Sequence, residues 1–578
     1  MGSIFRALAV DFDGTLTNDG QRPAYAVLAA LARARANGCR VVMVTGRMLA
    51  ELRADFPDVE DHVDAIVAEN GCVLAMGGAT RMLTAPVDAV LARALADAGV
   101  AARCGDAIIA CDGVHAMTVM RQIRDLGLDC QMVHNRDALM VLPAGVTKGT
   151  GLFETLGDLG VSRHSTIGVG DAENDHALLD VCEVGVAVAT AVPALQRHAD
   201  LVTRGGAGAG VVELVDGPVF DGRQAVHSRR WDMVLGASPS GEPVTLPTPQ
   251  LNLLVCGETG LGKSYVAGLM AERLIALGYC VLVVDPEGDH RELGRLRGTV
   301  TVDAAEGLPA PARVAALFRQ RFTSVVLDLS CLAPFERRAY LDGLAVQVAQ
   351  QRSDVGLPHW VVLDEAHVGE PEGLVSGYLD PGSHFRGQIL VTFRPFDLAP
   401  EVIAGLDGVL ALGGSEPLPG PVLEVACGVS GLDVRRVRHL AGAMRPHDAL
   451  LAVRPWLGTT TTVAFAARAT PQVRHAHKYG AVAVAPDKRF YFRDSGDGVV
   501  DVAGTMAELC VALARVNDDV LAHHAVTSDL SRWIASVFQD QALASAVAES
   551  EHQLTRHRIP VSEERARILG AVVRRYPR

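Results

Sequence analysis

Short apolar runs that end in polar residues alternate with Ala- and Leu-rich stretches along most of the chain. Buried parallel strands form near-continuous apolar runs, and helices connect one such strand to the next. The alternation predicts parallel α/β domains with ligand sites at the polar ends, because ligands bind at the carboxyl ends of such strands. The runs are FRALAVDFDGT (5–15), RVVMVTGR (40–47), TIGVGD (166–171), LNLLVCGETG (251–260), CVLVVDPEGD (280–289), SVVLDLS (324–330), HWVVLDEAH (359–367) and QILVTFRP (388–395).

A stretch rich in Pro, Ser and Gly separates two blocks of these runs. The segment ASPSGEPVTLPTPQ (237–250) has the composition of a connecting segment and predicts a linker at 217–248. A chain of 578 residues also exceeds what one hydrophobic core supports. We therefore expect one domain at 1–216, a second at 249–470 and a C-terminal module at 471–578.

Composition narrows the class of protein. The chain holds 53 Lys+Arg against 67 Asp+Glu, a formal net charge of -14, which argues against a protein that coats nucleic acid by neutralising phosphates. Its 11 cysteines include no CxxC pair, as expected in a reducing compartment without a zinc ribbon. We find no signal peptide and no apolar run of membrane-spanning length. A cytoplasmic protein without a membrane partner is expected.

The first block collects acidic and phosphate-binding residue types at strand ends. Asp11 and Asp13 stand one residue apart in DFDGT, Thr45 follows a second strand, Lys148 follows an apolar stretch, and GDAEND (170–175) follows a third strand. Two adjacent carboxylates repel each other unless a cation lies between them. Phosphoryl transfer requires a nucleophile, a cation for the phosphoryl oxygens and a proton donor for the leaving group. This constellation predicts Mg2+-dependent phosphoryl chemistry.

These four motifs, in this order, resemble the haloacid dehalogenase (HAD) superfamily of phosphatases in its Cof-like, class IIB branch. The resemblance implies that Asp11 attacks phosphorus to give an aspartyl-phosphate. It implies that Asp13 protonates the leaving alcohol and then activates water, while Thr45 and Lys148 hold the phosphoryl oxygens.

The same resemblance implies a ligand set for Mg2+. Asp11, the backbone carbonyl of Asp13 and Asp171 would hold the ion, with Asn174 and Asp175 supporting the metal shell. Gly14 and Thr15 would complete the first loop, and Asn70 with Gly71 in VAENG (67–71) is a further class IIB feature expected to line the site.

Residues from about 86 to 146 are expected to form a cap over this site. Helix-like APVDAVLARALADAG and strand-like AMTVM and CQMVH fit a small α+β lid, which would exclude water and select the substrate. Relatives with such caps act on sugar phosphates, phosphoglycolate or similar small phosphorylated metabolites. Charged candidates for substrate contact in the cap are Arg121, His134 and Arg136.

The second block opens with a phosphate-binding loop. GETGLGKS follows an apolar strand and precedes a helix, which is the context of a P-loop for ATP. Its backbone N–H groups would cradle phosphate, its lysine would reach the β and γ oxygens, and its serine would bind Mg2+. The loop comprises Gly257, Glu258, Thr259, Gly260, Leu261, Gly262, Lys263 and Ser264.

Further strand ends of this block supply acidic and polar groups. In VVLDEAH, Asp364 would lie in the second shell of the P-loop Mg2+ and Glu365 would polarise the attacking water. The series of motifs resembles the HerA/FtsK class of ATPases, in which a strand after Walker B ends in a polar sensor, often Thr-Gln. Here Thr392 is followed by Phe393 in place of glutamine. Asp285 and Glu287 resemble the acidic loop of the class, with a solvated turn as the alternative.

The resemblances imply a fold class and an assembly. We expect an α/β protein with a Rossmann-like HAD phosphatase domain and small α+β cap, then a RecA-like P-loop ATPase domain and a mainly helical C-terminal module. ATPases of this class form homo-oligomeric rings, often hexamers, in which an arginine reaches the neighbour's nucleotide. The candidates are Arg352, Arg386 and Arg394.

The C-terminal module holds clusters of His, Arg and aromatic residues, including RHAHKYG (474–480). Adjacent His523 and His524 would point about 100° apart on a helix and so are poor partners for one metal ion. A helical interaction module with Trp533, Ile534 and Phe538 in its core is the favoured interpretation.

Three functions remain open at this stage. In the first, the chain is a bifunctional hydrolase that joins a phosphatase to a regulatory or remodelling ATPase. In the second, it is a nucleic-acid translocase whose phosphatase acts on nucleic-acid ends or on nucleotides. In the third, it is a kinase-phosphatase. Glu365 argues against a kinase, which avoids activating water, and the acidic charge does not favour a nucleic-acid partner. We favour the bifunctional hydrolase.

Overall fold

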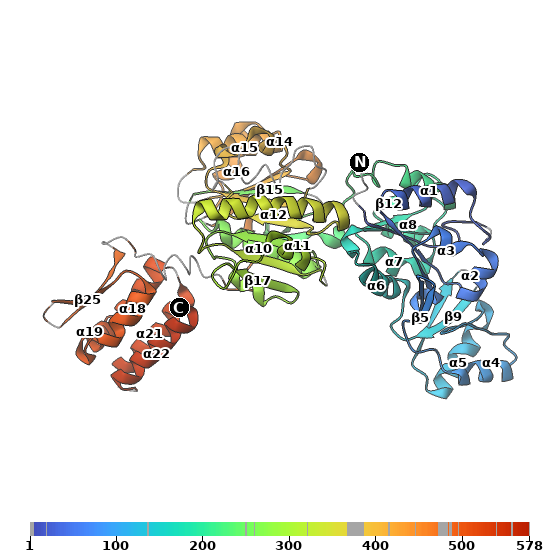
Figure 1. Cartoon of the computed structure of the whole chain (residues 1–578), viewed down its shortest axis with the longest axis horizontal. Coiled ribbons are helices and arrows are strands. Elements are labelled where there is room, and N and C mark those ends of the chain that lie inside the picture. Colours follow the sequence, from blue (N-terminus) through green and yellow to red (C-terminus); the bar gives the residue numbers. More distant parts are fainter. Residues whose placement is uncertain are drawn as a thin grey trace.

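The structure is a computed structural model that describes residues 5–18, 20–135, 138–248, 251–258, 261–320, 322–366, 386–413, 417–445, 447–471, 484, 488–494, 496, 498–538, 540–556 and 559–576. Three separately packed parts follow one another along the chain, coloured from blue to red in Figure 1. In the described ranges, no helix combines the length and the apolar character that a membrane span requires.

The first domain is built on a sheet in which eight of the described strands run in the order β12-β11-β10-β1-β2-β3-β4-β5. The strands from β12 to β3 are parallel, and β4 and β5 are added antiparallel at one edge. Their bounds are β1 (Ala7–Val10), β2 (Arg40–Val44), β3 (Ala65–Ala68), β4 (Val73–Met76), β5 (Ala79–Met82), β10 (Thr166–Gly170), β11 (Val184–Ala187) and β12 (Leu201–Val202).

Helices cover both faces of the central strands of this sheet, which is why strands such as β1, β3 and β11 are apolar throughout. On β1, Leu8 and Val10 pack with α1, α2 and α9 on one face, whereas Ala7 and Ala9 pack with α6 and α7 on the other. The helices are α1 (Tyr25–Ala36), α2 (Leu49–Asp55), α3 (Val59–His62), α6 (Lys148–Leu159), α7 (His176–Val181), α8 (Pro193–His198) and α9 (Ala207–Val215).

The expected small α+β cap is present. It is an antiparallel sheet in the order β6-β7-β9-β8 with two helices packed on it. Glu69, buried at the end of β3, accepts hydrogen bonds from the backbone N–H groups of Asp106, Ala107 and Ile108 at 2.9, 2.7 and 3.1 Å and so anchors the cap to the core domain. The cap elements are α4 (Ala89–Asp97), β6 (Arg103–Cys104), β7 (Ile109–Asp112), α5 (Ala116–Leu126), β8 (Cys130–Asn135) and β9 (Ala138–Pro143).

The second domain is a large mixed sheet in the order β14-β13-β23-β22-β21-β15-β20-β19-β16-β18-β17. The run from β21 to β17 is parallel, and the four strands at the other edge are antiparallel. The strands are β13 (Met233–Ala237), β14 (Pro243–Leu246), β15 (Asn252–Cys256), β16 (Val281–Asp285), β17 (Thr299–Asp303), β18 (Ser324–Asp328), β19 (Trp360–Leu363), β20 (Gln388–Thr392), β21 (Gly408–Leu412), β22 (Ala449–Val453) and β23 (Thr461–Phe465).

Alternate residues of the second sheet face different helices. Leu253 and Val255 of β15 pack with α10, whereas Leu254 and Cys256 belong to the core under α11, α12, α15 and α16. Figure 1 shows α12 running across this part of the molecule. The helices are α10 (Lys263–Leu277), α11 (Pro311–Leu317), α12 (Pro334–Val355), α14 (Pro400–Ala404), α15 (Gly420–Ser430) and α16 (Val434–Ala441).

The segment 217–248 differs from the linker that its composition suggests. It contains β13 and β14, which pair with each other and, through β13, with β23 of the second sheet. The Ser-, Pro- and Gly-rich residues after Ala237 form the turn between these two strands, with hydrogen bonds from Gly241 N–H to the Ser238 carbonyl. Turns and linkers are both rich in Pro, Ser and Gly, and in this segment that composition belongs to a turn.

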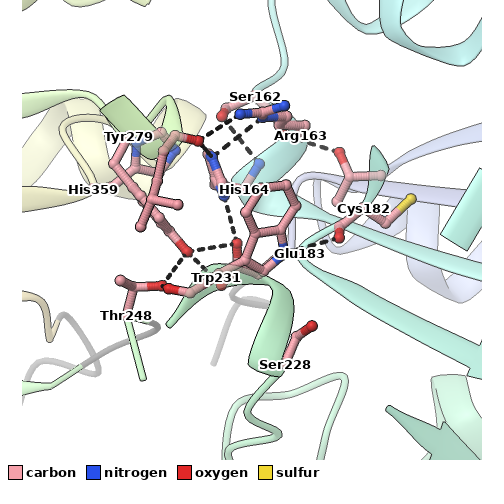
Figure 2. Close-up of polar contacts among 12 residues, drawn as sticks. Ser162, Arg163, His164, Cys182, Glu183, Ser228, Trp231, Thr248, Tyr279 and His359 are labelled. Atoms are coloured by element: carbon pink, nitrogen blue, oxygen red, sulfur yellow. Dashed lines mark hydrogen bonds and ion pairs between the residues drawn. The ribbon is translucent and has the colours of Figure 1, made fainter. Parts of the chain in front are cut away.

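The first two domains contact each other through a buried group of side chains, the interdomain cluster. We define it as Arg163, His164, Glu183, Trp231, Thr248, Tyr279 and His359, and Figure 2 shows these side chains converging from both domains. The rings of His164 and Tyr279 stack with centroids 3.7 Å apart. Tyr279 Oη donates to the Glu183 carboxyl at 2.9 Å, and His164 Nδ1 lies 2.6 Å from Glu183 Oε2.

The interdomain cluster fixes the two domains to each other at the amino ends of their strands. Trp231 Nε1 donates to the Cys182 carbonyl at 3.2 Å, and the Arg163 guanidinium lies 4.8 Å from the Trp231 ring. His164 precedes β10 and Tyr279 precedes β16, so the cluster lies at the opposite ends of these strands from their polar carboxyl termini. A direct exchange of substrates between the two sites is therefore not favoured by this arrangement.

The C-terminal part is mainly helical, as expected. A hairpin of β24 (Phe490–Arg493) and β25 (Val499–Ala503) packs with helices around a separate apolar core that includes Trp533, Ile534 and Phe538. The helices are α18 (Met506–Arg515), α19 (Asp518–Val526), α20 (Asp529–Trp533), a π-helical turn (Ile534–Phe538), α21 (Gln541–Thr555) and α22 (Val561–Arg575). RHAHKYG (474–480) lies outside the described residues.

Candidate functional site

The residues expected to form the phosphatase site meet at one edge of the first sheet. Val10 of β1 is in register with Val169 of β10 and with Met43 of β2, so the residues that follow these strands lie side by side. Asp11, Thr45 and Asp171 occupy those positions, and all three are buried. The parallel register therefore brings together residues that are far apart in sequence.

Lys148 connects the acidic groups. It is the first residue of α6, whose N-terminus is capped by the Thr147 side chain. Its Nζ atom lies 2.7 Å from Asp11 Oδ1 and 2.6 Å from Asp175 Oδ1, and its side chain is only 1% exposed. Gly71 permits this placement, because a Cβ atom there would lie 2.1 Å from the Thr147 carbonyl oxygen.

Asp175 organises the loop that carries Asp171. Its Oδ2 atom accepts hydrogen bonds from the N–H groups of Asp171 and Ala172, both at 2.9 Å, while its other oxygen faces Lys148. Asp171 Oδ1 accepts a hydrogen bond from Thr15 Oγ1 at 3.0 Å. Asp175 is thus occupied by the loop and the lysine, which suits a supporting role.

The electrostatics of this site fit a divalent cation. Ligand atoms of Asp11, Asp171 and Asp175 lie within 4.8 Å of one another, and all three residues are buried. Burial and the neighbouring Asp175 raise the pKa of Asp11 well above its usual range, with Lys148 acting in the opposite direction. Burial disfavours the charged form of Lys148, but Asp11 and Asp175 outweigh it and raise the pKa of the lysine. One lysine cannot neutralise three buried carboxylates, so oxygen ligands of this kind suit Mg2+.

Two other expected site residues, Asn174 and Thr45, form hydrogen bonds with Asn70 and Arg47 respectively. Asn174 Nδ2 donates to Asn70 Oδ1 at 2.9 Å, and Asn70, in the left-handed region with φ 54°, donates to Met140 Sδ of the cap. Asn174 is therefore tied to Asn70. Thr45 Oγ1 accepts the Arg47 N–H at 3.1 Å and lies buried beside the carboxylates.

Arg47 is a site residue that the sequence analysis missed. Its Nε and Nη2 atoms lie 2.7 Å from Asp13 Oδ2 and 2.7 Å from Asp13 Oδ1, and its Nη1 lies 2.5 Å from Asp55 Oδ2. The signal was present in the sequence, because Arg47 stands two residues after Thr45 at a strand end.

A cavity of about 440 Å³ lies between this edge of the core domain and the cap. Arg121 and His134, the described cap candidates, are exposed and do not line it, and Arg136 lies outside the described residues. The cap instead contributes Arg103 and apolar groups. The cavity is lined by Asp13, Gly46, Arg47, Met48, Glu51, Ala54, Asp55, Arg103, Ile108, Ala110, Ala138 and Met140.

The second candidate site lies at the carboxyl ends of β15, β19 and β20. The P-loop follows β15, and α10 begins at Lys263 after Gly262, which has φ 95°. Lys263 Nζ lies 3.1 Å from the Glu258 carbonyl oxygen. Gly257 and Leu261 flank the turn, while Thr259 and Gly260 lie outside the described residues.

Asp364, which follows β19, is held by a histidine that the sequence analysis did not identify. Asp364 Oδ2 lies 2.8 Å from His290 Nε2, and Asp364 also accepts a hydrogen bond from Ser264. Burial raises the pKa of Asp364, but the hydrogen bond and charge of His290, together with the hydrogen bonds from the Glu365 N–H and from Ser264, outweigh it and the net pKa is lowered. Glu365 follows with φ 51°, and its N–H donates to Asp364 Oδ1 at 2.9 Å.

Asp285 organises the acidic loop after β16. Its carboxylate accepts backbone N–H groups from Glu287, Gly288, Asp289 and His290 at 3.2, 2.8, 3.1 and 2.7 Å. This buried group therefore shapes the loop that presents His290 to Asp364, so the alternative of a solvated turn does not hold for Asp285.

The sensor strand β20 ends beside the P-loop. Thr392 is buried and its Oγ1 accepts the Arg394 N–H at 2.9 Å. The Phe393 ring lies 5.8 Å from Lys263 Nζ, and the Arg394 guanidinium lies 5.1 Å from the same ring. Phe393 thus occupies a place next to the P-loop lysine.

The three arginine-finger candidates differ in environment. Arg352 is buried and donates to the carbonyl oxygens of Pro358 and Gly387 at 2.9 and 3.2 Å, so it is a structural residue within one chain. Arg386 pairs with Asp407. Arg394 follows β20, has a half-exposed side chain and lies 3.6 Å from Asp397 Oδ2.

His524 has a structural role in the C-terminal part. Its Nδ1 lies 2.8 Å from Asp529 Oδ2, and its Nε2 accepts the Arg493 N–H at 2.9 Å. Both ring nitrogens of His524 are therefore hydrogen-bonded within the module.

Comparison with known proteins agrees with this division. A family model described as haloacid dehalogenase-like hydrolase matches residues 8–102 and 127–215, and one described as Helicase HerA, central domain, matches 243–334. Phosphoglycolate phosphatase of Methanothermobacter thermautotrophicus is 32% identical over 222 residues, covering 36% of this chain and 97% of that protein. Phosphoglycolate phosphatase of Pyrobaculum aerophilum is 34% identical over 221 residues, covering 36% and 94%. The chain belongs, through its N-terminal domain, to the haloacid dehalogenase-like hydrolases, and it carries a HerA central-domain region after that domain.

Proposed function

We propose that the chain is a bifunctional hydrolase, in which a Mg2+-dependent phosphatase for a small phosphomonoester is joined to an ATP-hydrolysing domain. The observation that carries the phosphatase half is the buried contact of Lys148 with Asp11 and Asp175, next to Asp171, at the carboxyl edge of a parallel sheet. The two phosphoglycolate phosphatases that resemble the first domain favour phosphoglycolate as the substrate.

The residues of the first site would act in sequence. Asp11 is the carboxylate that attacks phosphorus, and a phosphoryl-aspartate forms as the ester oxygen leaves. Lys148 and Thr45 bind the phosphoryl oxygens, and Lys148 also reduces repulsion between the carboxylates around it. Asp13, at the mouth of the cavity, gives a proton to the leaving oxygen and then takes one from the water that hydrolyses the phosphoryl-aspartate.

Mg2+ would be held by Asp11, the Asp13 carbonyl and Asp171, and when bound it supplies positive charge that neutralises the phosphoryl oxygens. Asp175 would keep the Asp171 loop and Lys148 in place, and Asn174 would brace the loop through Asn70. The cap would close the cavity over the substrate and exclude water during the first transfer.

In the second domain, Gly257 to Ser264 would bind the phosphates of ATP, with Lys263 at the β and γ oxygens and Ser264 binding Mg2+. Asp364 would support Ser264, Glu365 would polarise water, and Thr392 would contact the γ-phosphate side of the site. The contact of Asp364 with both His290 and Ser264 supports this assignment. A homo-oligomeric ring is proposed with it, with Arg394 reaching the neighbouring nucleotide.

A screen of phosphomonoesters with wild type and Asp11→Asn tests the phosphatase, run in parallel with ATP hydrolysis. We expect Mg2+-dependent release of phosphate from phosphoglycolate by wild type alone, and equal ATP hydrolysis by both proteins. Retention of phosphate release by Asp11→Asn would refute the proposed nucleophile. Transfer of phosphate from ATP to an added alcohol would instead favour the kinase-phosphatase alternative.

A further inference from the structure

Arg47 uses only part of its hydrogen-bonding capacity. A guanidinium carries five N–H donors: one on Nε and two on each Nη nitrogen. Nε and Nη2 each donate to Asp13, and Nη1 donates to Asp55. One N–H on Nη1 and one on Nη2 therefore have no acceptor among the described residues.

The position of the guanidinium is fixed by its surroundings. It lies over the Phe12 ring, 5.0 Å from the ring centroid, and the bidentate contact with Asp13 defines its plane. Gly20, with φ 71°, passes so close that a Cβ atom there would lie 2.2 Å from Arg47 Nη2. The side chain is nevertheless 21% exposed and lines the cavity.

Arg47 and Arg103 are the cationic side chains among the described residues that line this cavity. Lys148 lies deeper, between Asp11 and Asp175, where the phosphoryl group would bind. Arg103 comes from β6 of the cap, has a side chain 61% exposed, and pairs with Glu51 at 2.6 Å. Of the two cavity arginines, Arg47 is the one that contacts Asp13, the residue proposed to protonate the ester oxygen.

We propose that Arg47 determines specificity by binding a carboxylate on the leaving group through its two remaining N–H groups. This inference rests on the proposed phosphatase function. In phosphoglycolate the carboxyl carbon is two bonds from the ester oxygen, so an ester oxygen in contact with Asp13 places the carboxylate next to the arginine that holds Asp13. A planar guanidinium matches a carboxylate in geometry and charge, and such charge-assisted pairs are the strong ones.

The acidic side chains that line the cavity would repel an anionic leaving group, so binding such a group requires a direct contact with an arginine. Asp13 and Asp55 already face Arg47, and Glu51 faces Arg103, so the cavity is not generally cationic. An anionic leaving group would be repelled by these acids unless an N–H pair receives it directly. Arg47 would thereby position Asp13 and select the substrate at the same time, whereas a purely positioning role would affect every phosphomonoester alike.

The test compares two substrates across matched variants. Phosphoglycolate carries the carboxylate, and ethyl phosphate has a leaving group of similar size without it. We expect wild type to have the higher kcat/KM for phosphoglycolate. In Arg47→Gln and Arg47→Lys that preference should fall by roughly ten- to a hundredfold, on top of any loss common to both substrates, because a hydrogen-bonded charge contact is lost.

Two control variants sharpen the assignment. Arg53→Gln removes an arginine that pairs with Glu60 on the surface and lies outside the cavity, so the preference should be unchanged. Arg103→Gln should also leave the preference within a few-fold of wild type. A selective loss of phosphoglycolate hydrolysis in Arg103→Gln would overturn the assignment to Arg47.

The outcomes separate this inference from the proposed function. Equal losses for both substrates in the Arg47 variants would overturn the inference and leave the phosphatase standing. So would a wild-type protein that hydrolyses both esters equally well, a measurement that needs no variant to fold. Wild type that hydrolyses no phosphomonoester would overturn the proposed function and the inference with it.

Discussion

The two candidate sites of this chain hold their lysines in different ways. Lys148 lies between two carboxylates that belong to loops far from it in sequence, with Nζ to oxygen distances of 2.7 and 2.6 Å. Lys263 has a backbone carbonyl of its own P-loop at 3.1 Å and the Phe393 ring at 5.8 Å. Lys148 therefore contacts acidic side chains that are distant in sequence, whereas Lys263 contacts the backbone of the loop that precedes it.

The acidic groups of the two sites also differ in how many lie together and in which partners they have. Asp11, Asp171 and Asp175 form a buried cluster with more negative charge than Lys148 neutralises. Asp364 in the second domain lies 2.8 Å from His290 Nε2 and accepts a hydrogen bond from Ser264. The first site thus gathers three buried carboxylates near one lysine, a set of oxygen ligands that fits a divalent cation, whereas Asp364 has a histidine and a serine as partners.

The largest expected effect separates the two activities. Asp11→Asn should lower phosphatase turnover by on the order of 10⁴-fold or more, because an amide cannot attack phosphorus, and ATP hydrolysis should be unchanged. Phosphate release from phosphoglycolate and from ATP, measured on the same preparation, checks this. A parallel fall in both rates would show that the two sites are not independent.

Matched substitutions of the two lysines test the comparison directly. Lys148→Met leaves buried carboxylates unpaired and should cost ~3–5 kcal/mol of folding stability in EDTA, part of which Mg2+ should restore. Lys263→Met removes a contact with a carbonyl oxygen and should leave thermal stability nearly unchanged while abolishing nucleotide binding. Calorimetry of both variants with EDTA, Mg2+ and ATP gives the answer. Equal destabilisation by the two substitutions would contradict the distinction drawn between the sites.

Replacement of Glu365 by glutamine in the second site should slow ATP hydrolysis without preventing ATP binding. Glu365→Gln should keep ATP binding and lower hydrolysis by roughly a hundredfold or more, because the amide keeps the shape but does not polarise water. Trapped ATP should then favour a larger oligomer in light-scattering chromatography, whereas Lys263→Met should not respond to ATP. A Glu365→Gln protein that binds ATP and stays monomeric would contradict the proposed ring.

The sequence was most informative where strand and loop are adjacent. Asp11, Thr45 and Asp171 each end an apolar run, and parallel register alone brings such ends together. The contact of His290 with Asp364 spans 74 positions and depends on how Asp285 folds the intervening loop, which no local pattern encodes.

In the cap and at the domain boundary, residue type alone predicts neither which side chains line the cavity nor where a linker lies. Arg121 and His134 are charged candidates by sequence, but both are exposed and lie outside the cavity lining, to which the cap contributes Arg103 and apolar groups. Around residue 240, a turn between two paired strands has the same Pro, Gly and Ser content as a linker. Strand pairing between segments distant in sequence, such as β13 with β23, determines the structure of this region.

The smallest expected effect concerns the contact between the domains. Burial raises the pKa of Glu183 to about 8, although the hydrogen bond from Tyr279 acts in the opposite direction. Burial, with Arg163 nearby, lowers the pKa of His164 well below its usual value. Arg230 and Asp200 also act on Glu183, with opposite signs. Both shifts favour a protonated Glu183 beside a neutral His164.

These shifts have opposite consequences for stability. Because the folded pKa of Glu183 is raised, its contribution is complete below the ordinary glutamate pKa and is lost as pH rises toward about 8. Because the folded pKa of His164 is lowered, its contribution is present above the ordinary histidine pKa and is lost as pH falls below it. Between the ordinary histidine pKa and about 8, the Glu183 trend therefore dominates, and rising pH should weaken the contact between the domains.

Glu183→Gln isolates this effect, because an amide offers one acceptor to Tyr279 and one donor to His164, as a protonated carboxyl does. From pH 6.5 to 8.5, wild type should lose about 1–2 kcal/mol more stability than the variant. Thermal unfolding of both proteins across this range measures the difference. Tyr279→Phe, which removes the hydroxyl and keeps the ring stacked on His164, should leave the pH dependence in place and lower stability at every pH. Identical pH profiles for wild type and Glu183→Gln would mean that Glu183 binds no proton in the folded protein over this range, which would contradict its raised pKa.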